Sequence, residues 1–361
     1  MLVSSIASLQ PGTILAKNIY GSNGNVLLAA GKQLSAPMIQ RLEALGVTQV
    51  YIQDPRTDDI IIEEAVSEET RNRAVKVVYE TFSQMVEARK WMKAVANNRL
   101  GRDFRRAFED ILYDLQSKKQ VMVNLSNIYT TDNYLYSHSV NVGIYSATLG
   151  MTLGLKRDEL IDLGIGAMLH DIGKTQIPQE ILNKPGKLTD EEYAIMKDHS
   201  MIGYQILKEQ PDIPLLSAHC ALQHHERLDG TGYPRQLKAG QIHLFGQIVG
   251  IADVYDALTS NRVYRKGYLP HEALEILFAS TGGFDSELIA KFRDHIALYP
   301  IGLMVRLSTG EQAVVVDINT RFPQRPIVRV LYNAAGEDVT PYEVDLSQDL
   351  TLLITEVEEV L

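Results

Sequence analysis

The spacing of apolar residues changes near residue 60 and again near residue 300. Before residue 58, short apolar runs alternate with turn residues, a pattern typical of strands. The Gly-Ser-Asn-Gly-Asn sequence at 21–25 predicts a hairpin turn. Strands are predicted at residues 14–15, 26–28 and 50–52, and a short helix at 38–45. Residues 54–59 are interpreted as the linker that leaves this small unit.

Between residues 63 and 300 the pattern is helical. Long charged amphipathic helices are predicted at 63–94 and 101–116, and Val75, Val78, Phe82 and Met85 recur at helical spacing in the first. These helices either pair between two copies of the chain or pack on the core of their own chain. After Pro300, strands are predicted at 305–307, 312–318, 327–332 and 350–354.

This pattern predicts a mainly α fold with β-rich units at both ends. We expect four parts: a small β-rich N-terminal domain (1–58), a helical connector (59–118), a helical domain (119–300) and a β-rich C-terminal extension (301–361).

Composition narrows the class of protein. Hydrophobic residues make up 45% and charged residues 22% of the 361 positions, which is ordinary globular usage. A net charge of −10 argues against a nucleic-acid polymer as the main partner, because phosphate backbones are bound by cations. A single cysteine, no apolar run long enough to span a bilayer and no basic leader predict a cytoplasmic protein without a membrane span.

His199 lies in a helix predicted to begin with a capping box at residues 189–192. Helical spacing places it on one stripe with Ile195, Ile202 and Ile206. A histidine in an apolar stripe needs a partner for each ring nitrogen. For one residue alone, a hydrogen bond to a backbone carbonyl is the ordinary explanation.

Two apolar segments carry carboxylates at positions that are predicted to be buried. Residues 160–169 are almost wholly apolar and lead directly into His170 and Asp171. A later apolar helix has Asp253 and Asp256 as its charged residues, three positions apart. A buried carboxylate is costly unless it is paired with a cation, so these segments predict either buried ion pairs or bound metal.

His138 and the adjacent His224 and His225 extend this group of residues. Neighbouring positions at a helix end diverge by roughly 100°, so these two imidazoles can serve two ions or two sides of one cluster. Five imidazoles and two carboxylates without thiolates predict a cluster of Fe, Mn, Co, Ni or Zn, in which Asp171 can bridge two ions. The seven residues are His138, His170, Asp171, His199, His224, His225 and Asp253.

Several motifs within residues 124–297 carry a family resemblance. They are HSVNV at 138–142, HDIGK at 170–174, ILNKPGKL at 181–188, His199, HHERLDGTGYP at 224–234 and DVYDALT at 253–259. With these motifs the chain resembles the HD-GYP family, a helical branch of the HD phosphohydrolases that hydrolyses the bacterial second messenger cyclic di-GMP. The resemblance implies an HD-type helical bundle as the catalytic domain at 119–300.

The resemblance also implies roles for individual residues. The seven residues of the predicted cluster fall on the family's metal ligands, with Asp171 bridging and Lys174 beside the reactive centre; both are expected to be catalytic. The expected substrate-binding residues are Lys174, Tyr233, Pro234, Asp256, Arg262 and Arg265, and the two arginines hold phosphates. Tyr134 replaces a glutamate that helps some relatives to bind a third metal, so we expect a dinuclear site. Gln247 replaces an arginine of many relatives and leaves the ligand set complete.

The expected cofactors are two divalent ions, Fe or Mn first, with Zn, Co and Ni compatible. About 3.5–4 Å apart, they share Asp171 and a hydroxide that attacks a phosphodiester in line with the departing 3′ oxygen. Lys174 offsets charge on the phosphoryl oxygens. The expected first product is linear pGpG, and the missing third-metal ligand weakens the case for hydrolysis on to GMP.

Two alternatives stay open. The same chemistry can act on another cyclic dinucleotide, such as cyclic GMP-AMP, because no residue of the motifs separates guanine from adenine. A non-catalytic module that senses the nucleotide or docks a diguanylate cyclase is the other, and such a module is expected to have lost ligands. Cyclic di-GMP, a second copy of the chain and a cyclase are thus the partners under consideration.

Overall fold

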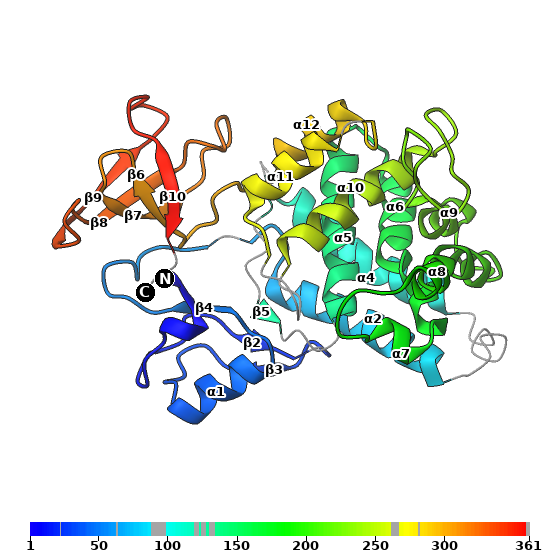
Figure 1. Cartoon of the computed structure of the whole chain (residues 1–361), viewed down its shortest axis with the longest axis horizontal. Coiled ribbons are helices and arrows are strands. Elements are labelled where there is room, and N and C mark those ends of the chain that lie inside the picture. Colours follow the sequence, from blue (N-terminus) through cyan, green and yellow to red (C-terminus); the bar gives the residue numbers. More distant parts are fainter. Residues whose placement is uncertain are drawn as a thin grey trace.

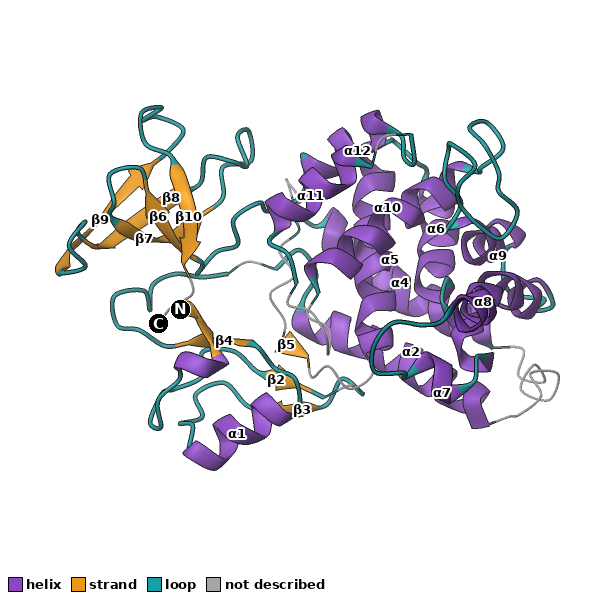
Figure 2. Ribbon diagram, in the orientation of Figure 1, coloured by secondary structure: helices purple, strands orange, loops and turns teal. Residues whose placement is uncertain are grey.

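The computed structural model describes residues 1–21, 23–62, 64–87, 99–118, 123, 128–129, 134–260, 267–280 and 282–358. The described chain forms a large helical body and two β-rich units beside it (Figure 1, Figure 2). The mainly α fold class is confirmed. Among the described helices, none combines the length and the apolarity needed to cross a membrane.

The helical body is built around α5 (Tyr134–Thr152), which is buried along most of its length. It packs against α6 (Arg157–Leu169) and α10 (Leu244–Thr259), and all three are rich in apolar residues on every side, as expected of central helices. The surrounding elements are α2 (Glu68–Glu87), α4 (Leu100–Gln116), η2 (Ile172–Gln176), α7 (Gln179–Leu182), α8 (Asp190–Lys208), α9 (Leu215–Gln223), α11 (Pro270–Ala279) and α12 (Ser286–Arg293).

The two connector helices pack on the core of their own chain. α4 matches its prediction within one residue, and α2 lies inside the predicted range 63–94, of which 63 and 88–94 are outside the described residues. Both helices bury aromatic side chains in the same apolar cluster as α5 and α6. These side chains are Phe82, Phe104 and Phe108, each at most 1% exposed. The structure therefore supports packing within one chain.

The N-terminal unit contains two small sheets. β1 (Leu2–Ser5) pairs antiparallel with β4 (Gln49–Ile52). β2 (Ile19–Tyr20) pairs antiparallel with β3 (Val26–Leu28) and parallel with β5 (Ile128–Tyr129), just before α5. The unit also holds η1 (Ile6–Ser8) and helix α1 (Ala36–Ala44), which matches the predicted helix.

The predicted strand at 14–15 is wrong. Ile14 and Leu15 form only isolated bridges, to Gln33 and Ile52. The hairpin partner of β3 is β2, because the turn at 21–25 joins the residues that directly flank it.

The C-terminal unit is a five-stranded antiparallel sheet with the order β10-β6-β7-β8-β9. Its strands are β6 (Met304–Leu307), β7 (Gln312–Asp317), β8 (Ile327–Tyr332), β9 (Asp338–Asp345) and β10 (Ile354–Glu358). The prediction missed β9, a polar edge strand that tolerates Pro341 for that reason. The last strand begins where its predicted range ends, because the Asp349 side chain accepts from Thr351 N and forms a turn there.

The two β-rich units share an apolar cluster that includes Leu2, Tyr51 and Met304. Arg56 donates to Asp338 at 2.7 Å, and Arg329 donates to Asp59 at 2.6 Å. Residues 54–59 are thus held against the C-terminal sheet and do not form a free linker. The domain boundaries at 58, 118 and 300 stay predictions.

Candidate metal centre

The structure brings all seven predicted ligands together inside the helical body. They come from α5, the end of α6, the start of η2, α8, the end of α9 and α10. Six of them are buried, and His225 is partly exposed. Their donor atoms form three groups, each within 4.8 Å: His199 with His224 and His225, His138 with His170 and Asp171, and His170 with His224 and Asp253.

Asp171 lies between two pairs of imidazoles. Its Oδ2 is 3.4 Å from His170 Nε2 and 3.7 Å from His138 Nε2. Its Oδ1 is 3.4 Å from His199 Nε2 and 3.8 Å from His224 Nε2. Because the two oxygens face different pairs, this carboxylate has the geometry to bridge two cations.

Asp253 closes the cluster from the side of α10. Its Oδ1 lies 3.2 Å from His138 Nε2 and 3.8 Å from His170 Nε2, and its Oδ2 lies 3.8 Å from His225 Nδ1. This second carboxylate therefore faces His138 and His170 with one oxygen and His225 with the other.

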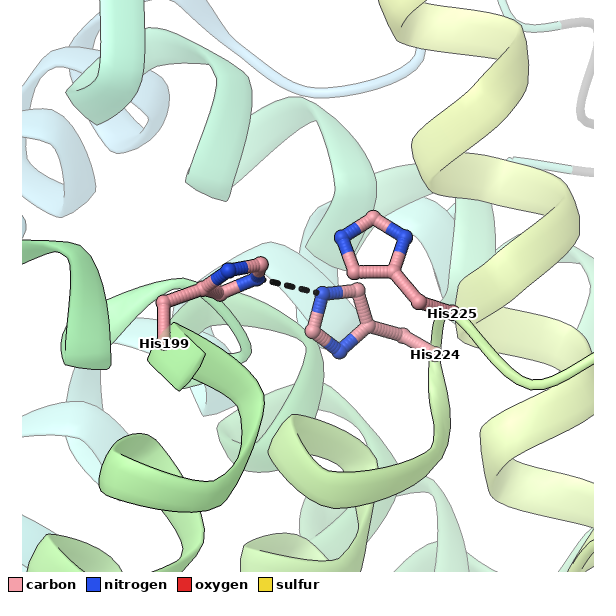
Figure 3. Close-up of side chains that lie close together, drawn as sticks. All are labelled: His199, His224 and His225. Carbon is pink, nitrogen blue, oxygen red and sulfur yellow. Dashed lines mark hydrogen bonds between the residues drawn. The ribbon is translucent and has the colours of Figure 1, made fainter. Parts of the chain in front are cut away.

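His199 of α8 meets the adjacent His224 and His225 at the end of α9 (Figure 3). The Nε2 atoms of His199 and His224 are 3.3 Å apart. The ring centroids of His199 and His225 are 5.1 Å apart. Three imidazoles so close together are favourable when they share a cation.

Backbone carbonyls orient three of the imidazoles. His170 Nδ1 is 2.6 Å from Ala167 O, His199 Nδ1 is 2.7 Å from Met196 O, and His224 Nδ1 is 3.1 Å from Cys220 O. A carbonyl only accepts, so in each ring Nδ1 carries the proton and Nε2 presents its lone pair to the cluster. This arrangement is the usual one for metal-binding histidines.

The residues present fit divalent metal. Within the described part of the chain, His170 Nε2 and Asp171 Oδ1 are buried side-chain atoms without a hydrogen-bond partner. An unsatisfied buried polar group costs about 1–3 kcal/mol, more when it is charged. A cation between the imidazoles and carboxylates satisfies both atoms, and the nitrogen and oxygen donor set suits first-row metals.

The carboxylates are held ionised. Burial alone raises the pKa of Asp171, but the charge of Lys174 is the largest of the effects that outweigh it and keep this pKa well below its usual range. Lys174 Nζ donates to Asp171 Oδ2 at 2.5 Å. Burial likewise raises the pKa of Asp253, and the hydrogen bond from His138 outweighs it. Both carboxylates are therefore charged at neutral pH.

The pKa values of the imidazoles differ within the cluster. Burial, with the charge of Lys174, lowers the pKa of His199 to about 4. Burial lowers the pKa values of His224 and His225 well below their usual range, so these rings are neutral and ready to bind metal. Burial alone lowers the pKa of His138, but hydrogen bonds to Asp253 and Asp256 outweigh it and raise the pKa to about 9. The space between His138 and Asp253 thus attracts positive charge.

Asp256 lies beside the outer nitrogen of His138, inside the helical body. It is 2% exposed, and its Oδ2 lies 2.8 Å from His138 Nδ1, on the side of the ring away from the cluster. Tyr134 Oη donates to the same oxygen at 2.6 Å. Asp256 is therefore placed to hold His138, and its expected role in substrate binding stays a prediction.

Asn141 supports the centre, although the sequence motifs alone gave no role for it. Its Nδ2 donates to Asp256 Oδ1 at 2.7 Å, so it supports the carboxylate that holds His138. The available signal was an amide in an otherwise buried, apolar helix, three residues after His138.

The other expected substrate residues divide into two groups. Lys174 lies at the cluster, and the Tyr233 ring lies 4.6 Å from the His225 ring, with Pro234 next to it. Burial raises the pKa of the Tyr233 hydroxyl, which stays protonated. Arg262 and Arg265 lie outside the described residues.

Comparisons with known families match two segments of this chain. Residues 115–288 match the model of the HD domain, and residues 304–360 match the model of the KOW domain associated with HD domain. The first match contains the seven clustered residues, and the second covers the five-stranded sheet.

Several relatives carry the names of cyclic dinucleotide phosphodiesterases. The chain is 37% identical over 223 residues to "Cyclic di-GMP phosphodiesterase PA4108" of Pseudomonas aeruginosa, which covers 62% of this chain and 54% of that protein. It is 34% identical over 194 residues to "3'3'-cGAMP-specific phosphodiesterase 2" of Vibrio cholerae, which covers 52% of this chain and 37% of that protein. The chain spans about half, or less, of the length of these relatives.

Among the solved structures that match this chain, one example is similar along nearly all of its own length. It is Bd1817, a HDG"Y"P protein from Bdellovibrio bacteriovorus, with a TM-score of 0.49 and 18% identity over 81% of this chain and 98% of that one.

Proposed function

From the match of residues 115–288 to the HD domain and the similarity to the Pseudomonas relative, we propose that the chain is a metal-dependent phosphodiesterase of the HD domain family that cleaves cyclic di-GMP to linear pGpG. The observation that carries the proposal is the position of Asp171, whose two oxygens face two pairs of imidazoles. The name of the Pseudomonas relative supports the choice of substrate.

We assign the ligands to two cation positions that share Asp171. We place His138, His170 and Asp253 at one position and His199, His224 and His225 at the other. The nitrogen and oxygen donors are consistent with Fe or Mn, and Zn, Co and Ni remain compatible. When bound, two such ions supply positive charge for the phosphoryl group and lower the pKa of a shared water toward neutrality.

Lys174 is the catalytic side chain that the chain itself adds to this centre. Its ammonium group is held by Asp171, and its side chain keeps 24% of its surface exposed. A cation at this place can donate to a phosphoryl oxygen and stabilise the charge that develops during cleavage. It can also protonate the departing 3′ oxygen. Arg262 and Arg265 are proposed to hold the phosphates through bidentate hydrogen bonds.

A cyclic GMP-AMP phosphodiesterase is the second candidate function. The Vibrio relative carries the name of such an enzyme at 34% identity. Direct comparison of the two substrates decides between these candidates. The third hypothesis, a non-catalytic module, fits poorly because all seven expected ligands are present and converge.

The test is an assay of anaerobically purified protein loaded with Mn(II) or Fe(II). We expect pGpG from cyclic di-GMP, identified by chromatography and mass spectrometry, and a lower rate with 3′3′-cyclic GMP-AMP. His170→Ala and Asp171→Ala should abolish turnover, whereas His219→Ala, a matched histidine on α9 that packs against Tyr204, should not. A protein that carries metal yet leaves both dinucleotides intact would refute the proposed activity.

A further inference from the structure

Helix α2 lies before the segment that matches the HD domain, yet it directs a buried cation toward the metal centre. The cation is Arg71, whose side chain is 2% exposed. Its Nη2 atom donates to Asn141 Oδ1 at 2.5 Å. A guanidinium buried in this way needs a specific reason, because charged groups are rarely removed from water.

Three consecutive hydrogen bonds connect Arg71 to a predicted metal ligand. Asn141 Nδ2 donates to Asp256 Oδ1 at 2.7 Å, and Asp256 Oδ2 lies 2.8 Å from His138 Nδ1. Asn141, Asp256 and His138 are all buried. The chain of contacts therefore runs through the interior of the helical body, from α2 through α5 to α10 and back to α5.

Arg71 determines which way the Asn141 amide points. A guanidinium only donates, so the amide oxygen must face Arg71 and the amide nitrogen must face Asp256. If the amide reversed, its oxygen would face a carboxylate oxygen, and both donors would lose their acceptors. The carboxylate would then hold His138 less firmly, with its Nε2 less well directed into the cluster.

We infer that Arg71 is a positioning residue of the metal centre, which acts on His138 through Asn141 and Asp256. The inference rests on the metal site proposed above. It makes α2 part of the support of that centre, although the HD domain match begins after this helix.

Helix α2 also contacts the N-terminal unit and the element that carries Lys174. One turn before Arg71, Glu68 accepts from Asn18 of the N-terminal unit at 2.6 Å. At the other end of α2, Met85 O accepts from Gln176 of η2, the element that carries Lys174. The helix that orients His138 is thus the helix on which the N-terminal unit rests.

The test measures Mn(II) affinity without substrate, by competition with a chelating dye. Arg71→Met and Asn141→Ala should each weaken binding of one of two ions by about 10- to 100-fold, the usual effect of losing support behind a ligand. Because Arg71 acts through Asn141, the double variant should bind no more weakly than Asn141→Ala alone. Arg73→Met, an exposed neighbour paired with Glu69, is the matched control and should bind as the wild type.

Arg71→Lys keeps the positive charge and can still donate to Asn141, so the Mn(II) affinity of this variant should lie between those of the wild type and Arg71→Met. Thermal denaturation of the metal-free proteins shows which variants fold. If Arg71→Met does not fold, the Mn(II) affinities of Arg71→Lys and Asn141→Ala decide whether Arg71 positions His138. The positioning role would be overturned if Arg71→Lys, and Arg71→Met where it folds, bound Mn(II) as tightly as the wild type. It would also be overturned if the losses of affinity in the two single variants multiplied in the double variant. Arg71-dependent metal binding without dinucleotide cleavage would refute only the proposed function. A chain that binds no Mn(II) would overturn both.

Discussion

The carboxylate of Asp256 holds the outer nitrogen of His138, with 2.8 Å between Oδ2 and Nδ1. On the other side of the ring, His138 Nε2 faces Asp253. Two carboxylates of one helix thus contact opposite nitrogens of a single imidazole, and only the inner one is placed to share a metal.

Asp256→Asn should weaken metal binding by about 10- to 100-fold. An amide at this position can donate to Nδ1, which moves the imidazole proton to Nε2 and removes the lone pair that binds metal. Elemental analysis after dialysis measures the effect. Asp294→Asn, on an exposed aspartate at the end of α12, serves as the control. Equal metal retention in both variants would contradict the role of Asp256.

Lys174→Met should lower kcat by about 10²–10³-fold and leave the metal content unchanged, because a preorganised donor to developing charge contributes that much. Steady-state kinetics on metal-loaded protein checks the prediction. Lys208→Met, near the end of α8, removes a lysine that lies over the Tyr204 ring and should be kinetically silent. If Lys174→Met changed KM alone, the lysine would be a binding residue and not a catalytic one.

Removal of metal should lower the thermal stability of the protein. At a free metal concentration one hundred times Kd, each site adds about 2.7 kcal/mol to the free energy of unfolding. We expect the melting temperature to rise with Mn(II) in the wild type and to stay constant in Asp171→Ala, as measured by scanning calorimetry. An identical rise in the two proteins would place the stabilising ions elsewhere.

Gly173→Ala should destabilise the protein by about 1–3 kcal/mol or more, the usual range for overpacking. A Cβ at this position would lie 1.9 Å from His199 O and 2.7 Å from Gly203 N, both backbone atoms of α8. Gly143→Ala is the matched control, because its Cβ would meet only the flexible Met168 side chain at 2.8 Å. Urea denaturation of both variants measures the difference, and a smaller effect at Gly173 would be inconsistent with this close approach.

Acid should weaken the contact between the two β-rich units. The hydrogen bond from Arg329 lowers the pKa of Asp59 to about 2, whereas an unfolded aspartate titrates near 3.9. Because the folded pKa is the lower one, the contribution to stability is complete above about pH 4 and is lost as the pH falls toward 2. Asp59 is largely exposed, so the effect is small and screened by salt. Melting curves between pH 2 and pH 6 should show a weaker pH dependence in Asp59→Asn than in the wild type.

Helix positions and ligand types were predictable where the signal is local. The apolar face of α2 and the range of α4 follow directly from periodicity. Periodicity was less informative about which residues on one face of a helix are buried by a neighbouring element. Ile195 was assigned to the stripe of His199, yet it is 39% exposed while His199 is 1% exposed.

The β-rich units were less predictable, because their short strands depend on distant partners. β9 has the composition of an exposed loop and becomes a strand through its pairing with β8. Residues 54–59 have the composition of a linker, and contacts with residues far along the chain, among them Asp338 and Arg329, hold them in place.

The amino-acid order alone supplies the chemical groups: imidazoles and carboxylates at helix ends and in apolar stripes, where unpaired charge is unfavourable. Which atoms face one another is a property of the packed helices. In the sequence, Asp253 and Asp256 are alike: both are aspartates of one apolar helix. The packing of α5 against α10 places Asp253 at the metal-facing nitrogen of His138 and Asp256 at its outer nitrogen. The same packing brings Arg71 to Asn141 across seventy positions, because steric fit between helices, and not spacing along the chain, decides such distances.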